Sequence, residues 1–187
     1  MQKDKLAADA GVALIFAAKN GHTNIIKLIL DRDTPLTDIN FQDENGDTAA
    51  IWASQNGRFD LLKVLVSHGA NVHIPSKRLW NCLLCSVWSG NLDIAEFLLI
   101  DCGVNIDAIT KDGDTALIWA SQQGHYEICK MLLEMNCDHS ICSIKGWNAL
   151  LCACWKGFPP TIYIIISQLT ASLIRPFKYC AIITWCG

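Results

Sequence analysis

Five glycines recur along the chain at nearly even spacing: Gly21, Gly57, Gly90, Gly124 and Gly157. Each of them separates two short apolar segments, as in Thr115–Glu134, TALIWASQQGHYEICKMLLE. This pattern is typical of a helix, a tight turn and a second helix, because glycine supplies the positive φ that ends the first helix. A period of roughly 33 residues over almost the whole chain predicts a stack of similar helix pairs.

The second segment of each pair carries a broad apolar face. In two of the pairs this face consists of Leu61, Leu62, Val64, Leu65 and Val66, and of Ile94, Phe97, Leu98 and Leu99. One helix pair cannot bury such a face, so neighbouring pairs have to stack on it. Between the pairs, segments such as Gly69–His73 and Gly103–Asp107 favour turns and extended chain, which predicts hairpin-like fingers.

These units resemble ankyrin repeats, whose pattern runs roughly D-x-x-G-x-T-P-L-H-x-A-A-x-x-G-H. Asp43–His73 (DENGDTAAIWASQNGRFDLLKVLVSHGANVH) and Thr110–Leu133 (TKDGDTALIWASQQGHYEICKMLL) carry the resemblance. The chain departs from the family at T-P-L-H, where it has TAAI over Thr48–Ile51 and TALI over Thr115–Ile118. The resemblance implies an all-α ankyrin-repeat solenoid of helix-turn-helix units with hairpin-like finger loops.

The same alignment divides the chain into a repeat domain over residues 1–169 and an apolar tail over residues 170–187. We expect five repeats, at about residues 8–40, 43–75, 76–109, 110–142 and 143–169. The last one places Ile164–Ile166 on the buried stripe of Phe97–Leu99, in a second helix from about Pro160 to Leu169. Residues 157–174 carry no formal charge, so a membrane-associated segment is the alternative interpretation of this end.

Composition narrows the classes of function. With 15 Lys and Arg against 18 Asp and Glu and no cationic run, nucleic-acid binding is not expected. The ten cysteines include some at positions that hold Trp or Leu in other repeats, so we interpret them as buried hydrophobic residues of a protein in a reducing compartment. Cys82-x-x-Cys85 has no second pair at zinc-site spacing, so neither a metal nor a cofactor is expected.

The N-terminus is better read as repeat than as signal peptide, so we expect a cytoplasmic protein, with the nucleus as the alternative.

A second, longer period lies over the first. Residues 45–90 match residues 112–157 in register, with 21 of 46 positions identical. The array therefore reads as a duplicated pair of unlike repeats. The tryptophans follow this long period, since Trp52, Trp80 and Trp88 recur as Trp119, Trp147 and Trp155.

Six of the seven tryptophans, all but Trp185, separate into two classes. Trp52 and Trp119 stand between Ile and Ala in the first helices, and we expect both to belong to the core. The other four stand just before the first helix or two residues before the turn glycine, positions that face the concave groove in the family that the chain resembles. They are Trp80, Trp88, Trp147 and Trp155, with Lys77, Arg78, Lys111, Asp112, Asp114, Gln122 and Gln123 as their polar surround.

Exposed aromatic patches usually mark binding surfaces, and Trp is enriched among binding hot spots. The sequence therefore predicts a protein-interaction scaffold that binds a partner protein on its concave face, with these four indoles as anchors. If the indoles only cover the edge of the core, this prediction fails. The alternative function is the cytosolic portion of a membrane protein with a membrane-associated C-terminal segment.

No catalytic constellation of Ser, His, Asp or Cys recurs in register, and no phosphate-binding glycine motif is present, so an enzyme is not expected. The C-terminal end, with Ile162–Ile166 and Ala181–Gly187, lacks the polar outer face that a terminal repeat needs. We therefore expect the isolated chain to self-associate through this end.

Overall fold

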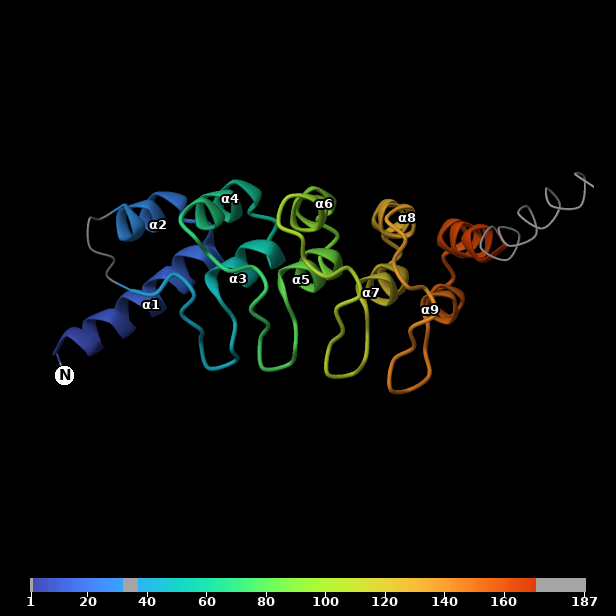
Figure 1. The fold of residues 1–187 in the computed structure, drawn as a ribbon, viewed down its shortest axis with the longest axis horizontal. Helices are drawn as coiled ribbons and strands as arrows, with labels where there is room; N and C mark the ends of the chain where they lie inside the picture. The colour runs from blue at the N-terminus through green and yellow to red at the C-terminus, as the bar shows by residue number, and fades with distance from the viewer. Residues whose placement is uncertain (1, 32–36, 171–187) are drawn as a thin grey trace, which may run out of the picture.

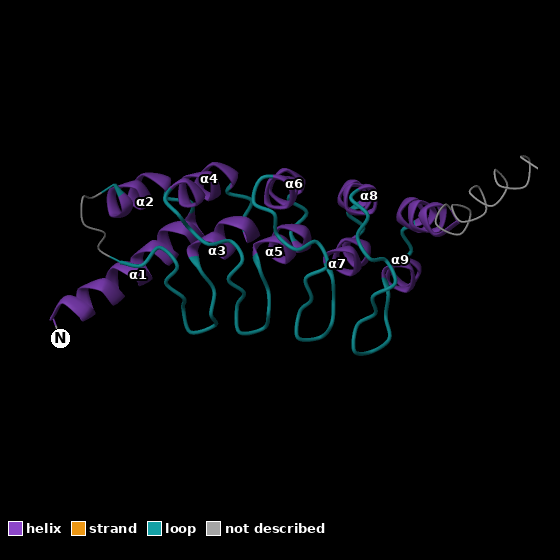
Figure 2. Cartoon of the chain, in the orientation of Figure 1, coloured by secondary structure: helices purple, strands orange, loops and turns teal. Residues whose placement is uncertain are grey.

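The computed structural model describes residues 2–31 and 37–170, which form consecutive helix pairs (Figure 1). The pairs are α1 (Gln2–Asn20) with α2 (Thr23–Leu30), α3 (Ala49–Gln55) with α4 (Phe59–Ser67), α5 (Cys82–Trp88) with α6 (Leu92–Ile100), α7 (Ala116–Gln123) with α8 (Tyr126–Glu134), and α9 (Ala149–Lys156) with a helix over residues 159–170. Loops join the helices, and the part of the chain that the structure describes contains no β-strand (Figure 2). The predicted all-α solenoid is confirmed.

The helices lie in two layers. The first helices of the pairs pack side by side in chain order, and the second helices form a parallel layer above them (Figure 1). The loops that lead into α3, α5, α7 and α9 extend away from the first layer, on the side opposite the second helices (Figure 2). We call these loops the fingers, and the surface that they form with the first helices the finger face.

A side-chain cap starts each first helix from α3 onward. The hydroxyl of Thr48 accepts a hydrogen bond from the backbone N–H of Ile51 at 3.2 Å, and Thr115 accepts one in the same way at 3.3 Å. In the alternate repeats Asn81 and Asn148 take this place, each accepting a hydrogen bond at 2.9 Å. Such caps satisfy a helix N–H that has no partner within the helix, which fixes where the finger ends.

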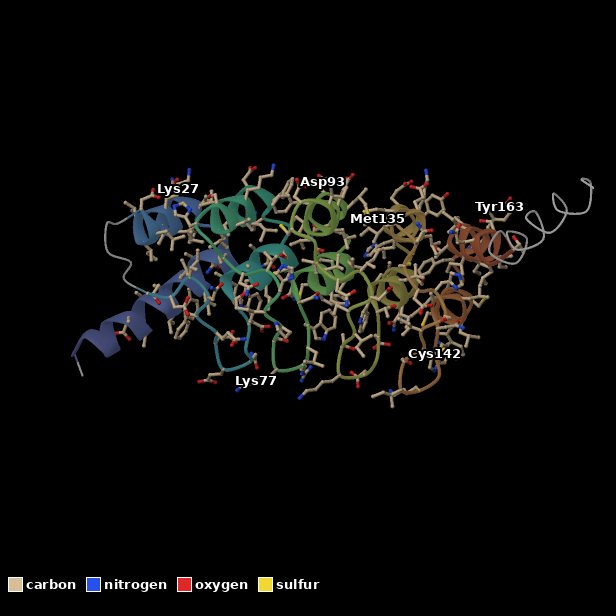
Figure 3. All side chains as sticks on the ribbon, in the orientation of Figure 1. Lys27, Lys77, Asp93, Met135, Cys142 and Tyr163 are labelled. Atoms are coloured by element: carbon tan, nitrogen blue, oxygen red, sulfur yellow. The ribbon has the colours of Figure 1, made fainter. Side chains whose placement is uncertain are left out.

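The fingers are linked to one another by backbone hydrogen bonds. The N–H of Lys77 donates to the carbonyl of Asn45 at 2.9 Å, Lys111 to Arg78 at 3.1 Å, and Ile144 to Asp112 at 2.8 Å. One of these backbone bonds thus joins each finger after the first to the finger before it. The side chain of Lys77 lies at a finger tip, on the opposite edge of the molecule from Lys27 and Asp93 of the second helices (Figure 3).

The core runs continuously between the two layers. In α5 six of the seven residues are buried, because this helix has a first helix on each side and its own second helix above it. The second helices bury a stripe narrower than the predicted face: Leu61, Leu62 and Leu65 in α4, and Ile94, Ala95 and Leu98 in α6. The other residues of the predicted face pack against this core but are only partly buried: Val64, Val66, Phe97 and Leu99. Each repeat therefore depends on its neighbours for burial.

The last helix pair is exposed on its outer side. Of the predicted stripe Ile164–Ile166, only Ile165, which aligns with Leu98, is buried, at 2% exposed, while Ile164 is half-buried. Tyr163 and Ile166 on the same helix are 76% and 44% exposed. Among the described residues no helix is both long and apolar enough to cross a membrane. The predicted tail, residues 170–187, lies outside the described residues except for its first residue, and self-association stays a prediction.

The described cysteines divide by exposure. Cys82, Cys85, Cys129, Cys137 and Cys152 are buried, Cys102 is half-buried, and Cys142 and Cys154 are exposed. Burial raises the pKa of Cys82 and Cys137 to about 12 and that of Cys129 to about 11, so these thiols hold almost no thiolate at neutral pH.

We expect iodoacetamide at neutral pH to alkylate Cys142 and Cys154 in the native protein at least about 100-fold faster than Cys82, Cys129 and Cys137, since the thiolate is the nucleophile. Peptide mapping by mass spectrometry measures each site separately. The same reaction in concentrated urea is the control, in which all sites should react at similar rates. Native labelling of Cys82 as fast as that of Cys142 would contradict the burial of this thiol in the core.

Candidate binding site

Hydrogen bonds of their backbone N–H and carbonyl groups hold two tryptophans at the ends of fingers. The N–H of Trp80 donates to the hydroxyl of Ser76 at 3.2 Å, and its carbonyl accepts from the Ser76 N–H at 2.7 Å. Trp147 is bound to Ser143 in the same way, at 3.2 Å and 2.8 Å. Because the following Asn caps the next helix, each indole is fixed at the junction of a finger and a first helix.

Each of these indoles meets a second one from the helix that it precedes. The ring centroids of Trp80 and Trp88 are 6.3 Å apart with the rings at 88°, and those of Trp147 and Trp155 are 5.8 Å apart at 76°. Both pairs therefore form near-perpendicular corners, a favoured aromatic geometry. Trp88 is 41% exposed and Trp155 is 76% exposed.

A cavity lies at each corner. The first, which we call the N-terminal pocket, has a volume of about 520 Å³ and is lined by Asn45, Asp47, Trp52, Gln55, Ser76, Lys77, Arg78, Trp80, Cys85 and Trp88. The second, the C-terminal pocket, has a volume of about 450 Å³ and is lined by Asp112, Asp114, Trp119, Gln122, Ser143, Ile144, Lys145, Trp147, Cys152, Trp155 and Lys156. Every residue of the N-terminal pocket has its counterpart, one long period further on, in the C-terminal pocket.

The third indole of each pocket, Trp52 or Trp119, is one that the sequence predicts to belong to the core. Trp52 and Trp119 pack against the core but are only half-buried, and their remaining surface lines the pockets. Their indole Nε1 atoms are buried and have no hydrogen-bond partner among the described residues. The long period was the signal in the sequence, since it relates these two residues in the same way as it relates the other indoles.

The two pockets are connected by the contact between one indole from each. The rings of Trp80 and Trp119 lie 5.1 Å apart at an angle of 47°, so the indole at one corner packs on the indole at the base of the next pocket. Trp88, Trp80 and Trp119 therefore form one continuous row of aromatic rings.

Each pocket also contains a carboxylate. Burial raises the pKa of Asp47 above its usual range, with the nearby Asp43 adding to the shift. Burial likewise raises the pKa of Asp114, Asp112 adds to that shift, and Lys145 opposes it. Within the described part of the chain, neither Asp47 nor Asp114 has a side-chain hydrogen bond or an ion pair.

The predicted polar surround is divided between the pockets and the surface beside them. Lys77 and Arg78 line the N-terminal pocket, while Asp112, Asp114 and Gln122 line the C-terminal pocket. Lys111 and Gln123 are exposed and line neither pocket. No group of three or more His, Cys, Asp or Glu that could hold a metal ion occurs within residues 2–31 and 37–170.

Comparisons with known proteins identify the family. The model of ankyrin repeats, in three copies, matches residues 3–76 and 83–173. The chain belongs to the ankyrin repeat family.

Three relatives indicate the range of proteins in which similar repeats occur. The chain is 28% identical over 148 residues, 77% of its length, to the palmitoyltransferase AKR1 of Lachancea kluyveri, of which it covers 20%. It is 33% identical over 122 residues, 64% of its length, to an ankyrin repeat and KH domain-containing protein of Caenorhabditis briggsae, of which it covers 5%. An ankyrin repeat protein of Acanthamoeba polyphaga mimivirus is 35% identical over 68 residues, 36% of this chain and 53% of that protein. The chain thus spans a fifth or less of the first two relatives.

Proposed function

We propose that this chain is a protein-interaction module that binds a partner protein on its finger face, with the two indole-lined pockets as anchoring points. Ankyrin repeats generally mediate protein–protein interaction. The observation that supports the finer proposal is the recurrence of a three-tryptophan pocket, with its indoles partly exposed, at the same place in two repeat pairs. Indole surface left in contact with water is a cost to the free protein that a bound partner removes.

The rigidity of the site favours binding. The backbones of Trp80 and Trp147 are fixed at both N–H and carbonyl, and the fingers that carry them are bonded to the preceding fingers. A preformed surface loses little conformational entropy when a partner docks, so more of the contact energy contributes to affinity.

The test is a variant in which Trp80, Trp88, Trp147 and Trp155 are all replaced by Ala. We expect it to retain helical circular dichroism and to lose most of the binding partners that the unmodified chain retains in a quantitative pull-down, because alanine substitution at a hot spot costs about 2 kcal/mol or more.

The matched control replaces four exposed apolar residues of the second helices by Ala: Ile25, Leu28, Ile100 and Tyr126. These residues lie in the layer away from the fingers, so this variant should keep its partners. Equal loss of partners from both variants would contradict the proposal. So would unfolding of the four-tryptophan variant, which would assign the indoles to the core.

A further inference from the structure

The two pockets combine aromatic walls with a carboxylate. In the N-terminal pocket two indoles stand at 88° and a third lines the same cavity. Asp47 and Cys85 line this cavity together with the indoles. Asp114 and Cys152 line the C-terminal pocket in the same way. Each carboxylate is therefore inside its pocket, beside the first helix.

Neither carboxylate forms an ion pair in the described structure. A partly buried carboxylate that lacks both a hydrogen bond and an ion pair is costly, and a bound cation removes that cost. The faces of indole rings also attract cations, because the ring carries negative charge density on its faces, and rings of this kind arranged around a site bind quaternary ammonium groups. Both the indole faces and the carboxylate thus favour a positively charged ligand.

The chain itself uses this chemistry just outside the N-terminal pocket. The ammonium group of Lys19 lies 4.3 Å from the centroid of the Trp52 ring. Lys19 stands two residues before Gly21, the position that Trp88 occupies before Gly90. It is not among the residues that line the pocket.

Resting on the proposed function, we infer that each pocket binds an ammonium group, a lysine or an alkylated lysine side chain of the partner protein, between the indoles and against the Asp47 or Asp114 carboxylate. The volumes of about 520 and 450 Å³ lie in the range of small-molecule sites and admit such a side chain. Because the pockets repeat on one face, a partner with two such side chains engages both.

The other charges at the pockets make them unequal. The N-terminal pocket is lined by one carboxylate, that of Asp47, and by two cationic side chains, Lys77 and Arg78. In the C-terminal pocket Asp112 adds negative charge, whereas Lys145 is close enough to act on Asp114. The C-terminal pocket is lined by Asp112, Asp114, Lys145 and Lys156, so its lining is less positive than that of the N-terminal pocket. It therefore binds the ammonium group more tightly, although Lys145 competes with the bound cation.

Choline is the probe, and its neutral isostere 3,3-dimethyl-1-butanol is the control ligand. Titration is followed through the indole Nε1–H signals in ¹H–¹⁵N NMR spectra. We expect millimolar choline to shift the signals of Trp80 and Trp147, and the neutral alcohol to bind at least about tenfold more weakly, because it lacks the charge that the rings and carboxylate attract. Equal binding of the two ligands would overturn the inference.

Two variants of each pocket make the test specific. Asp47→Asn keeps the shape of the side chain and removes its charge, and should weaken choline binding at the N-terminal pocket about tenfold while leaving the C-terminal pocket unchanged. Trp88→Ala should have the same selectivity, and Asp114→Asn and Trp155→Ala should act on the other pocket. Lys145→Gln should strengthen binding there. An Asp47→Asn variant that binds choline as well as the unmodified chain would refute the assigned role of the carboxylate.

The result is separable from that of the pull-down. If choline fails to bind while the four-tryptophan variant still loses its partners, the indoles anchor a neutral side chain, and only the ammonium inference is wrong. If choline binds as described and the four-tryptophan variant keeps its partners, the ammonium inference survives for a small ligand, and the proposed protein interaction is wrong.

Discussion

Replacing Leu84 with Ala is expected to lower the free energy of unfolding by about 3 kcal/mol. Leu84 is fully buried in α5, and this helix packs between α3 and α7 and beneath α6. Truncation removes apolar surface from the core and leaves a cavity. Because α5 is packed against a helix on each of three sides, the surrounding helices cannot move in to close that cavity. Urea denaturation followed by circular dichroism measures the change.

The matched control is Leu151→Ala. Leu151 is the counterpart of Leu84 in the long period and also donates its N–H to the Asn that caps its helix. It is 49% exposed, because in the described structure no further repeat packs on α9. We therefore expect this substitution to change stability by less than about 1 kcal/mol. If both substitutions lower the free energy of unfolding equally, stacking of neighbouring repeats does not determine the contribution of these leucines to stability.

The second large effect is expected for Gly46→Ala, at about 2–4 kcal/mol. Gly46 has a φ of +82°, and a Cβ atom there would lie 2.7 Å from the backbone nitrogen of Lys77. That nitrogen donates the hydrogen bond to Asn45 that joins two fingers, so the methyl group both strains its own residue and displaces the bond. The positive φ accounts for about 1 kcal/mol of the loss and the displaced backbone for the rest.

Gly146→Ala separates the two causes. Gly146 has the equivalent place in the last described finger and nearly the same φ, +76°, but no atom lies within 4 Å of the position that a Cβ atom would take there. We expect it to lose only about 1 kcal/mol, the cost of the positive φ. Thermal unfolding of the two variants beside the unmodified chain gives the comparison, and a difference below about 0.5 kcal/mol would show that the bond between fingers contributes little.

The behaviour of these residues also explains what the sequence could and could not predict. The period of the glycines and the apolar stripes are local patterns, and they predicted the helix pairs and the burial of residues such as Leu98 and Ile165. The recurrence of the indoles at equivalent positions followed from the repeat register, but their contacts with one another at near-perpendicular angles were not predicted. By contrast, the part of Trp52 that stays exposed depends on its neighbours from other repeats, which a single repeat does not reveal.

Backbone details were missed for a related reason. The fourth residue of each finger turn has a positive φ, and three of the four fingers place Gly there, but the finger of Trp80 has Leu79 with a φ of 61°. The side chain of Leu79 does not favour this conformation, but the long period aligns Leu79 with Gly146, so the repeat register is the signal in the sequence. The first helix also begins at Gln2, earlier than the expected start of the first repeat.

The alternation of two repeat types in one stack has a consequence for how such a chain changes length. The first helices pack in chain order, so α5, from the second repeat type, packs against α7, from the first. A block that comprises one repeat of each type therefore ends in a surface that fits its own beginning. Inserting or deleting such a block creates no interface that the chain does not already contain, and it adds or removes one pocket. The length of the finger face that can contact a partner and the number of pockets on it therefore change together, by one block at a time.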